Sequence, residues 1–151
     1  MKISAFDTKV IALPRERGPL SGGQADDNSF IMVLLKIWTN DGVEGIGYAS
    51  LAPRTMTKAL KAALDALAQH AIGRDPMDIE NVTGDLIRLG GDGSSYGLVM
   101  HAVAAIDVAL WDIKGKVSGQ PVHKLLGGNQ DRVHTYASGG LWRSHGLDAI
   151  A

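Results

Sequence analysis

The chain contains no cysteine among its 151 residues. It therefore has no disulfide bond, no thiolate metal site and no cysteine nucleophile. The absence of cysteine suits a reducing, cytoplasmic compartment. Aromatic residues make up only 5% of the sequence, and 15 Lys and Arg residues nearly balance 16 Asp and Glu residues. Because no basic cluster is interleaved with aromatic side chains, the sequence excludes a nucleic-acid-binding protein.

Long apolar runs are also missing. No uninterrupted stretch approaches the roughly 18 apolar residues that a membrane-spanning helix requires. At the N-terminus, Asp7 and Lys9 interrupt the apolar residues, so this segment lacks the continuous core of a signal peptide. We therefore expect a cytoplasmic protein that does not bind membranes.

Catalytic and metal-binding motifs are scarce as well. None of the five histidines stands in a metal-ligand spacing such as H-E-x-x-H. The glycine-rich stretch 90–97 lacks the lysine of a phosphate-binding loop and follows a predicted helix rather than a strand. Asp107 lies among alanines, so we expect a partly buried carboxylate with a structural role.

The composition is typical of a globular protein, with 45% hydrophobic and 21% charged residues. Three segments have the pattern of β-strands: 2–13, 30–39 and 43–49. The apolar face of the second strand consists of Ile31, Val33, Leu35 and Ile37. The Asn-Asp-Gly sequence at 40–42 predicts a tight hairpin turn. Gly45 and Gly47 permit a bulge or the close approach of another backbone in the third strand.

Apolar residues then recur at three- and four-residue spacing, which predicts amphipathic helices. The stripe of the first helix consists of Leu60, Ala63, Leu64, Leu67, Ala68 and Ala71, and this helix ends at Gly73. The second helix should begin at Pro76, with Asp75 as its N-cap. Its stripe consists of Ile79, Val82, Leu86 and Leu89.

The longest helix should be the third and the most buried. Its stripe consists of Val99, Ala102, Val103, Ile106, Ala109, Leu110, Ile113 and Val117. Ser94 or Ser95 can cap its start, and Gly119 and Pro121 stop it. The solubilising residues on its other side are Asp107, Asp112, Lys114 and Lys116. Alanines at 102, 104, 105 and 109 would let a neighbouring backbone approach closely.

The third helix and the turn after it contain an ordered string of residues: Ala102, Ile106-Asp107, Ala109-Leu110, Asp112-Ile113, Gly115-Lys116, Pro121-Val122 and Leu125-Leu126-Gly127. This string closely resembles the first signature of the mandelate racemase/muconate lactonizing enzyme family, part of the enolase superfamily. The resemblance implies an α+β fold in which residues 1–128 form the N-terminal capping domain, a three-stranded antiparallel meander followed by helices. It implies that residues 129–151 begin a (β/α)₈ barrel, with its first strand at 132–138. Such a barrel needs roughly 200 residues, so we expect the rest of it to be missing from this chain.

The chemistry of that superfamily is proton abstraction α to a carboxylate, with Mg²⁺ stabilising the ene-diolate and a Lys or His as the base. In the family these groups lie on later barrel strands, and residues 133–151 resemble none of them. We therefore expect no catalytic residue and no metal ligand here, with Mg²⁺ bound by residues further downstream. The resemblance also implies a small carboxylate substrate, a homo-oligomer, and no activity from this stretch without its barrel.

Five residues are candidate substrate contacts by this resemblance. Loop 14–29 corresponds to a lid over the barrel mouth, and its candidates are Arg15, Arg17 and Leu20. Arg54 belongs to a second loop that faces the active site in the family. Ser138 lies near the end of the expected barrel strand. For each arginine the alternative is a solvated surface charge.

The resemblance is nearest to the mandelate racemase branch, so we expect a sugar-acid or hydroxy-acid dehydratase or a racemase. A muconate cycloisomerase or epimerase is the alternative within the family. An alternative of another class is a non-catalytic α+β binding or assembly module, which would apply if 151 residues were the complete protein.

Overall fold

A computed structural model describes residues 1–14, 29–50, 54–91 and 97–135. Its strands are β1 (Ile3–Leu13), β2 (Phe30–Thr39) and β3 (Glu44–Ala49). Its helices are η1 (Arg54–Met56), α1 (Thr57–Ala71), α2 (Ile79–Leu89), α3 (Leu98–Ser118) and α4 (Val122–Leu125). The described residues within 1–11 and 31–128 form one compact unit. This order confirms the predicted α+β meander followed by helices.

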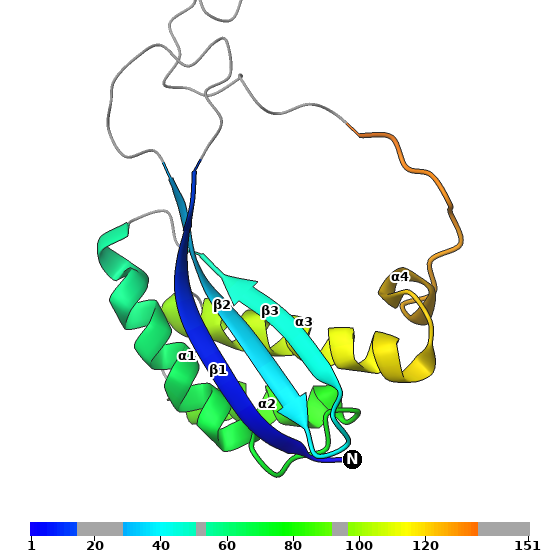
Figure 1. Cartoon of the computed structure of the whole chain (residues 1–151), viewed down its shortest axis with the longest axis horizontal. Coiled ribbons are helices and arrows are strands. Elements are labelled where there is room, and N and C mark those ends of the chain that lie inside the picture. Colours follow the sequence, from blue (N-terminus) through cyan, green and yellow to red (C-terminus); the bar gives the residue numbers. More distant parts are fainter. Residues whose placement is uncertain (15–28, 51–53, 92–96, 136–151) are drawn as a thin grey trace, which may run out of the picture. The chain divides into compact units, whose positions relative to one another are not determined.

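The sheet is a meander with strand order β1-β2-β3 (Figure 1). β2 and β3 are antiparallel, in a register that pairs Val33 with Ala49 and Trp38 with Glu44. The turn between them is closed by a hydrogen bond of 2.9 Å from the Thr39 N–H to the Val43 carbonyl. Gly42 supplies the positive φ of 80° that this turn needs. The predicted hairpin is therefore confirmed.

The core lies between one face of the sheet and the helices. Val33, Leu35 and Ile37 of β2 are completely buried on this face. Figure 1 shows α1, α2 and α3 behind the sheet, all on the same side of it. The helices contribute Leu60, Leu64, Leu67, Val82, Leu86, Ala102, Val103, Ala105, Ile106, Ala109, Leu110 and Ile113. The predicted apolar stripes are therefore the core-facing sides of the helices.

β3 lies directly against α3, and two glycines make this possible. A Cβ placed on Gly47 would overlap the carbonyl oxygen of Ala105, and one placed on Gly45 would overlap that of Ala109. Both alanines are completely buried. The prediction of a close backbone approach at these glycines and alanines is confirmed.

The ends of the helices differ from the sequence predictions. α2 begins at Ile79 and not at Pro76, because Asp75 closes a turn by accepting a 2.9 Å hydrogen bond from the Met77 N–H. The N-cap of α3 is Gly97, while Ser94 and Ser95 lie outside the described residues. Two residues of the predicted stripes are exposed near helix ends: Leu89 and Val117.

The predicted strand at 132–138 does not form over the residues that the structure describes. Residues 132–135 are exposed and carry no regular structure, and 136–138 lie outside the described ranges. A strand of a parallel barrel is stabilised by hydrogen bonds to strands on both sides. Within the described part of the chain, the sheet consists of β1, β2 and β3 and includes no strand from residues 132–135.

Candidate functional site

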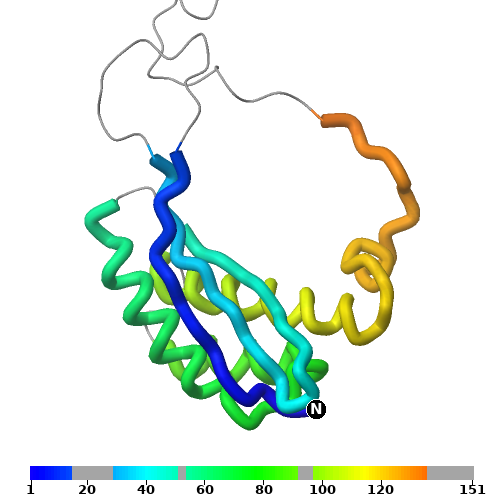
Figure 2. Tube along the Cα trace, viewed as in Figure 1, coloured from blue at the N-terminus to red at the C-terminus, as the bar shows by residue number. Residues whose placement is uncertain are grey.

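The segment that follows β1 and the segment that follows β3 leave the sheet at the same end. Because the strands are antiparallel, β1 runs toward the end where β2 begins and β3 finishes, which Figure 2 shows along the Cα trace. The register places Ala49, the last residue of β3, beside Val33 near the start of β2. The segments that follow β1 and β3 therefore leave the sheet at this end.

Arg54 is the one proposed substrate contact that the described ranges include. It opens η1, directly before α1, and its side chain is exposed. Arg15, Arg17, Leu20 and Ser138 lie outside the described residues. The structure therefore places Arg54 after the loop end of β3 and tests none of the five as a substrate contact.

A metal site in a chain without cysteine would need a cluster of His, Asp and Glu side chains. Across residues 1–14, 29–50, 54–91 and 97–135, no three of these side chains lie close enough to hold a metal ion. These residues therefore do not form a binding site for Mg²⁺. In the same ranges, no helix has the length and apolar character that crossing a bilayer requires.

Asp107 is half-buried on α3, in agreement with the sequence. Burial raises the pKa of its carboxyl above the ordinary value of 3.8, because partial removal from water disfavours the charged form. A second perturbed carboxyl, Asp85 on α2, shifts the opposite way. Hydrogen bonds from Arg74 and Arg88 lower the pKa of Asp85. Asp85 is a surface ion-pair centre that joins α2 to the segment before it.

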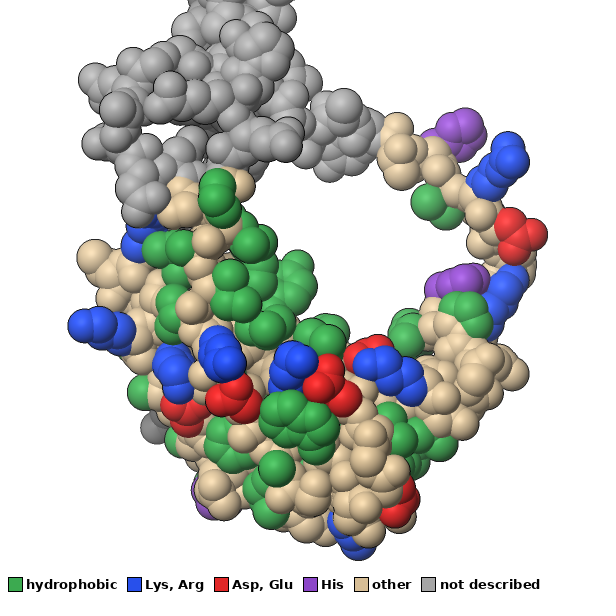
Figure 3. Space-filling model, in the orientation of Figure 1, with side chains coloured by type: hydrophobic (Ala, Val, Ile, Leu, Met, Phe, Trp, Pro, Cys, Tyr) green, Lys and Arg blue, Asp and Glu red, His purple; other side chains and the backbone are tan. Residues whose placement is uncertain are grey.

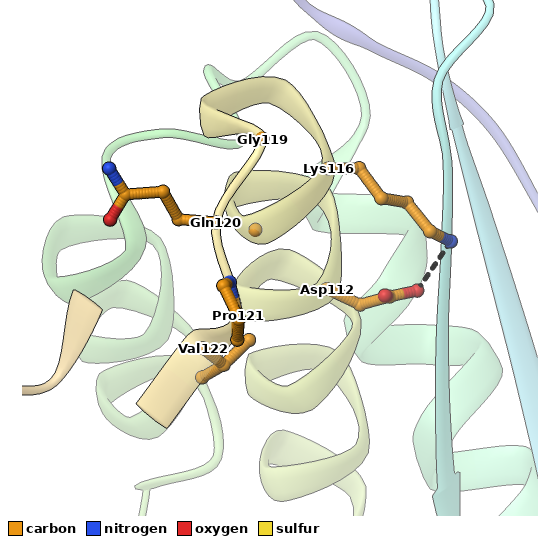
Figure 4. A pocket seen from close by; sticks show the side chains of 7 residues that line it. Asp112, Lys116, Gly119, Gln120, Pro121 and Val122 are labelled. Atoms are coloured by element: carbon orange, nitrogen blue, oxygen red, sulfur yellow. Dashed lines mark hydrogen bonds and ion pairs between the residues drawn. The ribbon is translucent and has the colours of Figure 1, made fainter. Parts of the chain in front are cut away.

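An open pocket of about 420 Å³ lies at the C-terminal end of α3 (Figure 4). It is lined by Asp112, Gly115, Lys116, Gly119, Gln120, Pro121 and Val122. On its wall, the Lys116 Nζ donates a hydrogen bond of 2.8 Å to the Asp112 Oδ2. The two charges lie one helical turn apart, so the pocket wall is close to neutral.

Asp112 and Lys116 have a role that the sequence did not show. Asp112 Oδ2 accepts a hydrogen bond of 2.8 Å from the Ile46 N–H, and Lys116 Nζ donates one of 2.7 Å to the Glu44 carbonyl. Both therefore hold the backbone of β3, whereas the sequence suggested solubilising charges. The signal in the sequence was their opposite charge at i,i+4 spacing.

Paired charges also cover the outer face of the sheet. Lys36 of β2 lies 3.1 Å from the Glu44 carboxylate of β3, and Lys9 lies 3.8 Å from Asp7 on β1. Figure 3 shows basic and acidic side chains close to one another in a band across the face that carries the strands. Exposed pairs of this kind are worth under about 1 kcal/mol each, and they leave the face without a dominant charge.

Comparisons with known proteins identify the family. The N-terminal domain of the mandelate racemase/muconate lactonizing enzyme family matches residues 5–127. L-talarate/galactarate dehydratase of Salmonella typhimurium is 32% identical over 131 residues, which cover 87% of this chain and 33% of that protein. A D-galactonate dehydratase family member of Pseudarthrobacter chlorophenolicus is 46% identical over 114 residues, covering 71% of this chain and 26% of that protein.

A solved structure extends the likeness to the fold. L-talarate dehydratase from Polaromonas sp. JS666, in complex with Mg and L-glucarate, aligns with a TM-score of 0.80 and 28% identity. The alignment covers 99% of this chain and 38% of that one. This chain thus spans about a third of the length of the relatives that it matches. The chain belongs to the mandelate racemase/muconate lactonizing enzyme family, of which residues 5–127 form the N-terminal domain.

Proposed function

We propose that this chain is the N-terminal part of a Mg²⁺-dependent sugar-acid dehydratase. The observation that carries the proposal is the similarity over residues 5–127 to proteins named as galactonate and talarate/galactarate dehydratases. The reaction would remove the proton α to the carboxylate and then lose the neighbouring hydroxyl as water. In this proposal residues 1–128 are the capping domain, and 129–151 begin the barrel that supplies the chemistry.

The role of this domain would be to bind and enclose the substrate. Arginine suits a sugar acid, because its planar guanidinium can donate two parallel hydrogen bonds to a carboxylate. Arg54 follows the loop end of β3, next to a segment that leaves the sheet there. We assign Arg15, Arg17, Leu20, Arg54 and Ser138 as substrate contacts.

Magnesium would be held by residues outside this domain. The described side chains offer no fitting ligand group, whereas the Polaromonas L-talarate dehydratase was crystallised with Mg. When bound, the ion would supply Lewis-acid stabilisation of the negative charge that develops on the substrate carboxylate. The assembled enzyme would be cytoplasmic and homo-oligomeric.

The assay of choice measures loss of water from galactonate, galactarate and talarate by the protein expressed from its complete reading frame. We expect a keto acid to form with Mg²⁺ and expect EDTA to abolish its formation. Racemisation or cycloisomerisation without dehydration would overturn the proposed reaction class. A monomer that neither turns over sugar acids nor responds to Mg²⁺ would favour the binding-module alternative.

The role of Arg54 is tested by Arg54→Ala in the same enzyme. Loss of a charged hydrogen bond to the substrate should raise KM about tenfold or more. Arg88→Ala is the matched control, because Arg88 is an exposed arginine on α2 that pairs with Asp85. Equal KM values for the two variants would show that Arg54 is a surface charge.

A further inference from the structure

β3 is an edge strand, because the strand order places it at one end of the sheet. Alternate residues of an edge strand direct both their backbone N–H and C=O away from the sheet. Such an edge is a template on which another strand can add. In β3 the residues with outward backbone groups include Glu44 and Ile46, as their bonds to α3 show.

The ion pair on α3 occupies one outward backbone group of each of these two residues. The Ile46 N–H donates to Asp112 Oδ2, and the Glu44 C=O accepts from Lys116 Nζ, at 2.8 and 2.7 Å. One residue of an added parallel strand would make the same two bonds, since it accepts from one N–H and donates to the C=O two residues earlier. The two side chains therefore take the place of a strand residue.

The pair is held in position by its own geometry. Lys116 also donates to Asp112 Oδ2 at 2.8 Å, so each charge fixes the other. Figure 4 shows the two side chains extending from successive turns of α3 with this bond between them. The glycine contacts of β3 on α3 keep the strand within reach of both groups.

The side chains beside these backbone groups would favour association with another chain if the ion pair were removed. The side chains of Ile46 and Tyr48 are 39% and 54% exposed, and both belong to residues of β3 whose backbone groups point away from the sheet. Apolar and aromatic residues on an exposed edge favour pairing with another chain. A second copy is the partner that such an edge fits, because one strand can pair antiparallel with itself about a two-fold axis.

We propose that the Asp112–Lys116 pair is an edge lock, which closes β3 to strand addition by a second copy of the chain. The lock acts through backbone groups of β3 and not through substrate. The proposal therefore stands independently of the sugar-acid activity.

The test compares two double variants of the full chain. Asp112→Ala/Lys116→Ala removes the lock and keeps good helix formers on α3. Asp65→Ala/Lys61→Ala is the matched control: that pair on α1 has the same i,i+4 spacing and the same 2.8 Å separation, but it bonds the side-chain hydroxyl of Thr8 on β1 and not a backbone group. Light scattering after gel filtration should show association beyond the parent's state for the lock variant only.

A cysteine reporter identifies the surface that associates. The chain has no cysteine, so Ile46→Cys gives a single thiol at the middle of the edge. Disulfide-linked dimers should form at least about tenfold faster in the lock variant than in the control, since a two-fold axis through position 46 pairs the two β3 strands antiparallel and brings the two thiols together. Equal cross-linking in parent, control and lock variant would overturn the proposal.

A gentler variant covers the case in which the double variant does not fold. Asp112→Asn keeps the shape of the side chain and loses the ion pair. We expect hydrogen exchange of the Ile46 amide to rise at least about tenfold, because a neutral acceptor holds the N–H less strongly. An Ile46 amide that exchanges at the parent rate would contradict the edge lock.

Discussion

Gly47 is the residue at which the backbone of β3 comes nearest to α3. In Gly47→Ala the new Cβ would overlap the Ala105 carbonyl oxygen, which belongs to the helix backbone and cannot rotate away. We expect the free energy of unfolding to fall by about 1–3 kcal/mol, as for other overpacked sites. Urea denaturation of the full chain measures this change.

Gly84→Ala is the control for that substitution. Gly84 lies in α2, and a Cβ there would meet only the end of the Arg88 side chain at 3.6 Å. Alanine should stabilise this helix by up to about 1 kcal/mol. A Gly47→Ala variant that is as stable as Gly84→Ala would mean that β3 and α3 are further apart than described.

The raised pKa of Asp107 predicts that the stability of the protein depends on pH. Because burial raises its pKa, the native state holds the proton more tightly than the unfolded state. Stability therefore falls as pH rises from the ordinary value of 3.8 through the raised pKa, and the penalty persists at neutral pH. Asp107→Asn should stabilise the protein by under about 1 kcal/mol at pH 7, and the gain should disappear in acid below the ordinary pKa.

The measurement is urea denaturation of parent and variant at neutral and acid pH. A variant that is less stable than the parent at pH 7 would show that the ionised carboxylate makes a favourable contact. In that case burial would not be the main influence on the Asp107 carboxyl.

The role of a single residue was predictable where its side chain suits one structural situation. Gly45 and Gly47 in a strand indicated a close backbone approach, and Ala105 and Ala109 supplied its other side. The contacts of Asp112 and Lys116 with β3 were not predictable, because sequence spacing shows that two charges share a helix face but not which backbone lies beside it.

At the scale of elements, α3 is tested by a charge placed on each of its faces. Ile106 is completely buried, so Ile106→Asp should cost several kcal/mol, about 3–5, by burying a carboxylate in the core. Val108→Asp is the control, because Val108 lies on the same helix and is 49% exposed. Thermal melting distinguishes them, and a similar Tm for both variants would mean that the packed face is misassigned.

Element boundaries were harder to predict than elements. β2 has the predicted bounds, because its apolar alternation is unbroken between a loop and a hairpin turn. The start of α2 was misplaced because an Asp before Pro can cap a helix or close a turn with the same kind of bond. Asp75 closes a turn, and the chain enters the helix only after Asp78. Leu89 and Val117 fit the helical period but lie near helix ends that extend past the core.

At the scale of the whole molecule, the family was recognisable from the ordered residues between Ala102 and Gly127 and not from any catalytic residue. Those residues pack β3 against α3 and end the long helix, which makes their order specific to one domain. The first barrel strand stays a prediction, because a barrel strand needs neighbouring strands to pair with and residues 136–138 lie outside the described ranges. The substrate contacts remain predictions, since four of the five lie outside the described residues.

The central claim is that this domain sits at the start of a longer barrel enzyme, and the coding sequence beyond Ala151 tests it most directly. We predict an open reading frame of roughly 200 further residues, in which strand and helix patterns alternate as a (β/α)₈ barrel requires. A Lys-x-Lys pair should appear within about one strand-helix unit of Ala151, roughly 30 residues on. A natural stop codon directly after Ala151 would contradict the account.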